Sequence, residues 1–244
     1  SSAVLRNAFG MPALGDIRAR LMALADKGLH GNDEIHTLFA YRLPLDGKKS
    51  ALLHEMQSLV QGSHPLLWQV PLPMKGIIQG HLHSFFRAMP EDFSLAGASI
   101  GNLVLTAGYM SHNRRLNPVI ALYSRMVHAR GVVRPIVETP AHLAVRLASG
   151  EVVIGQHRFS GKEAHGVRSP IQALWLTQNT ATAEPCQVPL RQRTAGRISS
   201  ADLICYPLGS FYSSVAANLL PSGVGRAIAA NPCPKVFIPN LGTD

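Results

Sequence analysis

The last part of the chain carries a strand–turn–helix–strand pattern that few folds accommodate. Residues 203–206 form a short apolar run, and the turn at 207–210 leads into a helix whose first residues carry hydroxyls. A second apolar run, 236–238, is followed by Asn240. Free N–H groups and a partial positive charge make a helix N-terminus an anion site, and ligands of open α/β sheets lie at the carboxyl ends of strands. The pattern therefore predicts an α/β fold with a phosphate-bearing ligand at this corner.

Composition places the chain among globular proteins with anionic partners. It has 244 residues, of which 46% are hydrophobic and 15% charged, so a packed core is expected. Its 23 basic and 14 acidic residues give a net charge of +9, which favours nucleotides, phosphorylated metabolites and other anions. The basic residues are scattered and aromatic residues make up only 6%, so nucleic acid is an unlikely partner.

Two further features concern location. The 3 cysteines include no CxxC pair, which indicates reduced thiols and hence a cytoplasmic protein. The chain has no apolar run of about 18 residues, so we expect no membrane-spanning segment.

The N-terminal half is predicted to be mainly helical. A helix is expected from Asp16, taken as its N-cap, with Ile17, Leu21 and Leu24 on one apolar face. Residues 45–90 are interpreted as an insertion or subdomain. Further helices are expected over 33–42, 50–59, 77–88 and 99–109, and from Asn117, as a cap before Pro118, through Val127 to a stop at Gly131.

The C-terminal half is predicted to contain most of the strands. Residues 132–138 indicate a strand that Pro135 interrupts, and 173–176 indicate another. Alternation over 143–147 and 152–154 predicts a β-hairpin. Because strands alternate with helices, we predict an α/β fold with a mostly parallel sheet, covered on both faces, and an inserted β-hairpin.

Seven segments, taken in order, resemble the 2-phospho-L-lactate transferase-like (CofD-like) superfamily, and most closely its gluconeogenesis-factor (YvcK-like) branch. Each motif alone is weak, whereas the whole set in the family's order and spacing is specific. The segments are 12–18 (Pro-Ala-Leu-Gly-Asp-Ile-Arg), 38–42 (Leu-Phe-Ala-Tyr-Arg), 97–103 (Gly-Ala-Ser-Ile-Gly-Asn-Leu), 129–135, the hairpin at 141–155, 207–213 (Pro-Leu-Gly-Ser-Phe-Tyr-Ser) and 234–243.

The resemblance implies a Rossmann-like three-layer sandwich over residues 1–244, taken as a single domain and expected to form a homodimer. It also implies a fragment of a longer protein, because the chain opens on Ser1 and Ser2 inside a family motif (Asp-Asp-Gly-Gly-Ser-Ser) and stops at Asp244, where relatives continue. These two serines are then ligand-binding candidates. Two functions remain open. One is transfer of a phospholactyl-type group from an activated nucleotide, with Mg²⁺ as a possible cofactor. The other is a non-catalytic regulator, active in carbon metabolism or cell-envelope control, that binds a UDP-sugar.

The motif at 15–18 supplies the first candidate residues. Asp16 is either a helix N-cap or a carboxylate that binds Mg²⁺ or orients a hydroxyl nucleophile, and it is the catalytic and metal candidate. Gly15 precedes it. Arg18 is either a solvated charge or a clamp for a phosphate.

The motif at 97–102 supplies a second set. Its small residues suit close helix packing, but Asn102 at the head of an apolar helix needs hydrogen-bond partners if it is buried. Asn102 either caps the helix or binds a ligand, and the resemblance to the family motif favours Ser99, Gly101 and Asn102 as ligand-binding residues.

The C-terminal motifs supply the third set. Ser210 is a plausible N-cap, and the hydroxyls after it suit an anion or a sugar. The ligand-binding candidates there are Gly209, Ser210, Tyr212, Ser213, Asn240 and Thr243.

Other chemistries have weak support. His81 and His83 have no predictable third metal ligand, and no nucleophile-elbow context supports a hydrolase triad. A flat acceptor would need a second pocket, for which Trp68, Phe85 and Phe86 are candidates, although such residues more often pack in a core.

Overall fold

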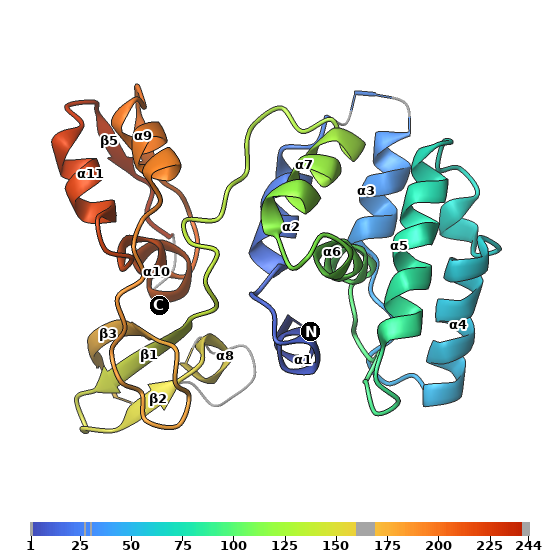
Figure 1. Cartoon of the computed structure of the whole chain (residues 1–244), viewed down its shortest axis with the longest axis horizontal. Helices are drawn as coiled ribbons and strands as arrows, with labels where there is room; N and C mark the ends of the chain where they lie inside the picture. Colours follow the sequence, from blue (N-terminus) through green and yellow to red (C-terminus); the bar gives the residue numbers. More distant parts are fainter. Residues whose placement is uncertain (1, 27, 30, 160–168, 241–244) are drawn as a thin grey trace. The chain divides into compact units, whose positions relative to one another are not determined.

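The computed structural model describes residues 2–26, 28–29, 31–159 and 169–240 and divides into two compact units, Ser1–Pro135 and Ile136–Asp244 (Figure 1). Each unit has its own cluster of buried apolar side chains. The regular elements described in the first unit are all helices, whereas the second combines strands and helices. The division into two units does not test the single-domain prediction, which stays a prediction.

The N-terminal unit is built around helix α6. Figure 1 shows α6 viewed nearly along its axis, and α2, α3, α5 and α7 all contact it. The helices are α1 (Ser2–Phe9), α2 (Gly15–Ala23), α3 (Asn32–Ala40), α4 (Lys49–Gln61), α5 (Met74–Ala88), α6 (Ile100–Ser111) and α7 (Leu116–Met126), with a 3₁₀ turn, η1 (Pro65–Leu67).

Helix α6 is central because its sequence is apolar all round. Every residue from Ile100 to Tyr109 is buried, as expected of a helix enclosed by others. Small residues on this helix let its neighbours approach. A Cβ added at Gly108 would lie 2.9 Å from the Val119 side chain of α7.

The segment 45–90 is part of this core. Helices α4 and α5, which it supplies, pack on each other, and α5 packs on α6. Their inward residues follow helical spacing and are fully or almost fully buried: Leu52, Met56, Leu59, Ile78, Leu82 and Phe85. Whether the segment is an insertion relative to other proteins stays a prediction.

The C-terminal unit holds two small sheets. Strands β2, β1 and β3 form an antiparallel sheet in that order, and the β1–β2 hairpin has Val145 opposite Val153. The elements are β1 (His142–Leu147), β2 (Val152–Ile154), α8 (Gln156–Phe159), β3 (Ile171–Thr177), α9 (Gln192–Ser199), β4 (Ile204–Tyr206), η2 (Phe211–Ala216, a π-helix), α10 (Ala217–Leu219), α11 (Val224–Ala230) and β5 (Lys235–Phe237).

Strands β4 and β5 pair in parallel, with Cys205 opposite Val236. Parallel pairing needs a crossover, which η2, α10 and α11 supply. The strand–turn–helix–strand prediction for this region is therefore confirmed.

The predicted fold class is confirmed only in its coarser part. The protein is mixed α/β, but the larger described sheet is antiparallel rather than mostly parallel. The physical reason lies in the N-terminal unit, where the described helices follow one another without intervening strands and so provide no parallel crossovers. The strand predicted at 132–138 is irregular around Pro135.

Several helix ends differ from the prediction. Leu14, not Asp16, occupies the N-cap of α2, and Arg115, not Asn117, that of α7. Helix α7 ends at Met126, well before Gly131. Short polar residues suit both caps and first turns, so residue type alone did not locate the boundary. Among the described residues, no helix is both long and apolar enough to cross a bilayer.

Candidate functional site

The first candidate site lies at the N-terminus of α6, where the ends of α2 and α3 meet it. Phe39, near the end of α3, offers a carbonyl oxygen that two predicted site residues share. Arg18 Nη1 donates to it at 3.0 Å, and Ser99 Oγ donates to it at 3.2 Å. The structure thus brings the motif at 15–18 and the motif at 97–102 together.

Arg18 is half-buried at this point. Burial lowers the pKa of its guanidinium, and the positive charge of Arg42 lowers that pKa further. The side-chain Nε of Arg18 is buried and has no hydrogen-bond partner in the described part of the chain. A cation that is partly desolvated and close to another cation is stabilised by an anion.

Gly101 is required by a close approach. A Cβ there would lie 2.8 Å from the Phe39 carbonyl oxygen and 2.9 Å from Arg18 Cδ, distances that real Cβ atoms essentially never show. The carbonyl of Gly101 accepts a hydrogen bond from Tyr123 Oη at 2.9 Å, whereas its N–H has no backbone acceptor among the residues described. That N–H lies in the first helical turn, where amides bind anions.

Asn102 is 3% exposed, and its Oδ1 has no partner within the described ranges. Its backbone is satisfied, because its N–H donates to the Ser99 carbonyl and its carbonyl accepts from Thr106 Oγ1. A buried unpaired acceptor costs about 1–3 kcal/mol. Two unpaired donors, on Arg18 and Gly101, and one unpaired acceptor, on Asn102, therefore gather at the head of α6.

Asp16 lies in the first turn of α2, two residues from Arg18, and its side chain is exposed. Gly15 is the first residue of that helix. No group of three or more His, Cys, Asp or Glu side chains among the described residues is placed to hold a metal ion, and this includes His81 and His83. Asp16 alone could supply one carboxylate, which suits Mg²⁺ only together with water and a ligand phosphate.

The second candidate site lies in the C-terminal unit, where β4 and β5 end. Gly209 N donates to Asn240 Oδ1 at 3.1 Å, and Asn240 Nδ2 donates back to the Gly209 carbonyl at 2.9 Å. A cavity of about 150 Å³ adjoins this pair. It lies at the carboxyl ends of two parallel strands, and its volume suits a phosphate-sized group more than a whole nucleotide.

The remaining C-terminal candidates have different surroundings. Ser210 occupies the N-cap of η2, but its hydroxyl makes no capping hydrogen bond. Ser213 is buried, and Tyr212 packs against the apolar core of this unit. Thr243 lies outside the described residues.

The two N-terminal serine candidates belong to the other unit. Ser2 is the first residue of α1, and Ser1 lies outside the described residues.

Replacing Asn240 by alanine is expected to lower the free energy of unfolding by about 1–2 kcal/mol, because two reciprocal hydrogen bonds are lost at an exposed site. Asn240→Asp keeps the acceptor but cannot donate to the Gly209 carbonyl, so it should lose about half as much. Urea denaturation measures both. Equal stability of all three proteins would show that the pair does not hold the loops.

A cluster beside the first site was missed by the sequence reasoning. Tyr41 Oη donates a short hydrogen bond to Glu55 Oε1, and His64 Nε2 lies 3.7 Å from the same oxygen. The Tyr41 carbonyl accepts from the N–H of Ile100 at the head of α6. The motif at 38–42 included Tyr41, but its partners come from the segment 45–90, and no local pattern predicts that pairing.

The hydrogen bond to Glu55, the largest cause, raises the pKa of Tyr41 to about 12. The neutral phenol is thus favoured in the folded protein, and its contribution to stability is complete below the ordinary value of 10.0 and lost as the pH rises from there to about 12. We expect the stability advantage over Tyr41→Phe to vanish across this window in urea denaturation series. An advantage that is constant with pH would contradict the assignment, as would ultraviolet titration of a Tyr41 phenol near 10.

The comparison with known families bears on these sites. The family model described as "2-phospho-L-lactate transferase CofD" matches residues 1–244. The chain belongs to the CofD family. The predicted resemblance to this family is therefore confirmed. The predicted gluconeogenesis-factor branch is confirmed as well, because the relatives described next carry that name.

The "Gluconeogenesis factor" of Listeria monocytogenes is 27% identical to this CofD-family chain over 217 residues, which cover 89% of the chain and 62% of the relative. The protein of the same name from Bacillus subtilis is 32% identical over 149 residues, which cover 61% and 43%. A solved UPF0052 family protein from Bacillus halodurans has a TM-score of 0.66 at 24% identity, and the match covers 98% of this chain and 57% of the other. The chain thus spans less than two thirds of the length of these relatives, and the last likeness concerns the fold alone.

Proposed function

We propose that this CofD-family protein binds a nucleotide or nucleotide-sugar at the head of α6. One observation carries the proposal, namely three polar atoms there that have no partner in the part of the chain that the structure describes: Arg18 Nε, the Gly101 N–H and Asn102 Oδ1. Phosphate oxygens accept from the guanidinium and the helix amide. A hydroxyl or N–H of the sugar or base donates to Asn102, which relieves a buried unpaired acceptor.

The regulatory alternative has one specific support, because the relatives from Listeria monocytogenes and Bacillus subtilis are named gluconeogenesis factors. In that reading the ligand is a UDP-sugar, and binding alone is the output. The catalytic reading is phospholactyl-type transfer, for which Asp16 orients the attacking hydroxyl or contributes one oxygen to a Mg²⁺ ion on the ligand phosphate. The ion would neutralise phosphate charge, while Arg18 and the head of α6 position the ligand.

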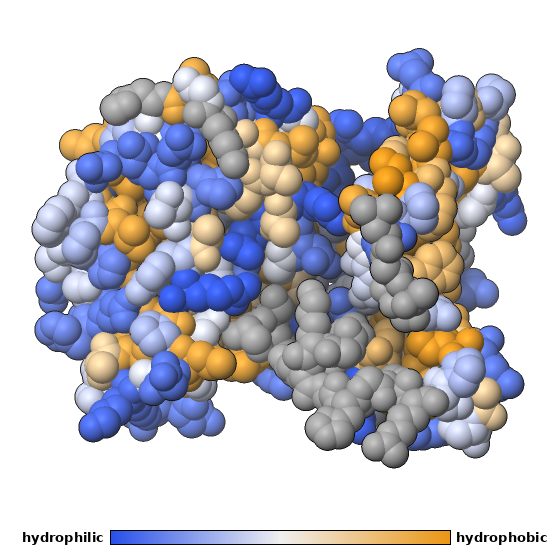
Figure 2. All heavy atoms as spheres, turned by 180° about the vertical axis from the view of Figure 1, so that it is seen from behind, coloured by the Kyte–Doolittle hydropathy of each residue, from blue (hydrophilic) through white to orange (hydrophobic). Residues whose placement is uncertain are grey.

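The sheet to which β4 and β5 belong, the oligomeric state and the location of the protein are also proposals. We assign β4 and β5 to a larger, mostly parallel Rossmann-like sheet. In support, Phe237 and Ile238 are 54% and 42% exposed, and Figure 2 shows apolar side chains on the surface of the C-terminal unit. A cytoplasmic location accords with the three free cysteines. The homodimer rests on the family resemblance alone, and the mass of the protein in solution tests it.

Calorimetric titration tests the binding proposal. GDP, GTP, UDP and UDP-N-acetylglucosamine are added with Mg²⁺ to the wild type and to Arg18→Gln, Asp16→Ala and Ser210→Ala. Arg20→Gln is the matched control, since Arg20 is an exposed arginine on the same helix. We expect Arg18→Gln to weaken binding about tenfold or more and Arg20→Gln to leave it unchanged.

The pattern among ligands separates the two readings. Binding of the UDP-sugar without turnover favours the regulator, whereas guanine-nucleotide binding that needs both Mg²⁺ and Asp16 favours the transferase. Equal losses in Arg18→Gln and Arg20→Gln, or no binding of any of the four ligands, would contradict the proposed site.

A further inference from the structure

A second polar site lies at the opposite end of α3 from the first. His128 follows the last turn of α7 and has a left-handed backbone, with φ at 45°. Glycine and asparagine are the usual residues in such a position after a helix, and histidine is among the other residues enriched there. The contacts of the imidazole ring show what holds it in place.

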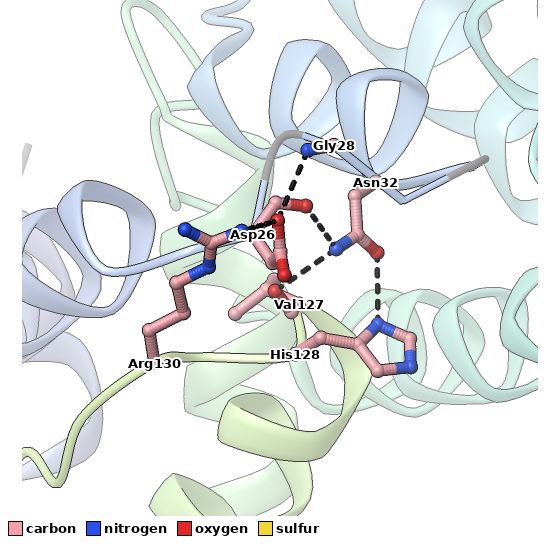
Figure 3. Close-up of polar contacts among 6 residues, drawn as sticks. All are labelled: Asp26, Gly28, Asn32, Val127, His128 and Arg130. Atoms are coloured by element: carbon pink, nitrogen blue, oxygen red, sulfur yellow. Dashed lines mark hydrogen bonds and ion pairs between the residues drawn. The ribbon is translucent and has the colours of Figure 1, made fainter.

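Asn32 fixes the ring (Figure 3). Its side chain is 2% exposed, and its Nδ2 donates both hydrogens to carbonyls, to that of Asp26 at 2.6 Å and that of Val127 at 3.2 Å. Both contacts are to acceptors, so the amide orientation is settled and Oδ1 faces His128 Nδ1 at 3.0 Å. The ring must then carry its hydrogen on Nδ1, and a neutral ring presents Nε2 as an acceptor.

Figure 3 shows Nε2 pointing away from Asn32. An open depression in the surface adjoins the ring, lined by Ser124, Arg125, His128 and Ala129. The neighbouring cation, Arg130, is engaged with Asp26 at 2.7 Å, whereas the Arg125 guanidinium has no partner in the described residues.

We propose that this open depression binds hydrogen phosphate. Arg125 supplies the charge and donates to the anionic oxygens, and the Ser124 hydroxyl is available as donor or acceptor. His128 Nε2 accepts the hydrogen of the P–OH group. Sulfate has a similar size and charge but no hydroxyl near neutral pH, so an acceptor held in this position distinguishes the two anions.

A simpler account is that Arg125 and His128 merely complement the carbonyls at the end of α7. That account gives no reason for the buried Asn32 side chain to fix the His128 ring. It also gives no reason for Nε2 of that ring to be left as a hydrogen-bond acceptor. It also predicts no preference between phosphate and sulfate. The two accounts therefore differ in a measurable quantity, and neither depends on the nucleotide site at α6.

Calorimetric titration of the chain with sodium phosphate and with sodium sulfate, near neutral pH in a phosphate-free buffer, tests the proposal. We expect the wild type to bind phosphate about fivefold more tightly than sulfate, the effect of one hydrogen bond to the exposed His128 ring. His128→Asn keeps a residue suited to the left-handed backbone but lacks Nε2, and it should lose the preference. Arg125→Gln should weaken both anions.

Arg18→Gln is the control for the other site and should leave phosphate binding at His128 unchanged. Nitrogen-15 spectra of the imidazole give a readout independent of affinity, with the hydrogen on Nδ1 in the free protein and a shifted Nε2 resonance with phosphate. The proposal is overturned by equal affinity for the two anions, by no phosphate binding, or by unchanged phosphate affinity in folded His128→Asn and Arg125→Gln proteins.

Discussion

Replacing Phe85 by alanine is expected to lower the free energy of unfolding of the N-terminal unit by about 3–5 kcal/mol. The Phe85 ring is fully buried, and its centroid lies 5.6 Å from those of both Phe9 and Phe93. The substitution leaves a cavity where α5 joins this core, and it also removes two aromatic contacts. Urea denaturation followed by circular dichroism measures the loss.

The matched control is another aromatic residue of the segment 45–90. Trp68 is 67% exposed, and its Nε1 donates only to the Ser63 carbonyl, so Trp68→Ala should cost about 0.5–1 kcal/mol. A small effect for Phe85→Ala, similar to that for Trp68→Ala, would mean that the segment is an appendage. Of these two aromatic residues, only Trp68 is exposed enough to stack on an acceptor, because Phe85 is fully buried in the core.

Replacing Gly101 by alanine is expected to remove nucleotide binding and to destabilise the N-terminal unit by about 1–3 kcal/mol. The new Cβ would lie 2.8 Å from the Phe39 carbonyl oxygen, a backbone atom that cannot rotate away. Either α3 or α6 must shift, and the Arg18 side chain must move with it. Calorimetric titration and urea denaturation give the two effects.

Gly80 provides the control, since it also lies inside a helix but has open space where its Cβ would be. Gly80→Ala should raise stability by about 0.5–1 kcal/mol and leave nucleotide affinity unchanged. If Gly101→Ala behaved like Gly80→Ala in both assays, the close approach of α3, α6 and Arg18 would have no functional meaning.

Local patterns predicted the elements whose determinants are local. The hairpin at 143–154, the strand now seen at Ile171–Thr177 and the helix now seen at Ile100–Ser111 were all expected. The parallel sheet was not confirmed, because strand pairing depends on residues far apart in sequence. The apolar run at 132–138 was a poor guide, since Pro135 cannot donate to a sheet.

The candidate site residues remain a prediction, although the structure brings several of them together. The resemblance at 97–103 and the need of a buried Asn102 for partners pointed to the head of α6, where Oδ1 is buried with no partner among the described residues. Arg18 and Ser99 both donate to the Phe39 carbonyl, and Ser99 is 60 residues away from Phe39 in the sequence. No periodicity predicts such a contact. The same holds for the pairing of Tyr41 with Glu55 and of Asn32 with His128.

Amide-resolved NMR of the nitrogen-15-labelled chain, titrated with UDP-N-acetylglucosamine and with GDP in the presence of Mg²⁺, tests the central claim most directly. The account predicts that the largest shift changes of the N-terminal unit fall on the amides of Gly101 and Asn102, with a matching change at the Arg18 Nε–H, for whichever ligand binds. Saturable binding that leaves these three signals unmoved would contradict it.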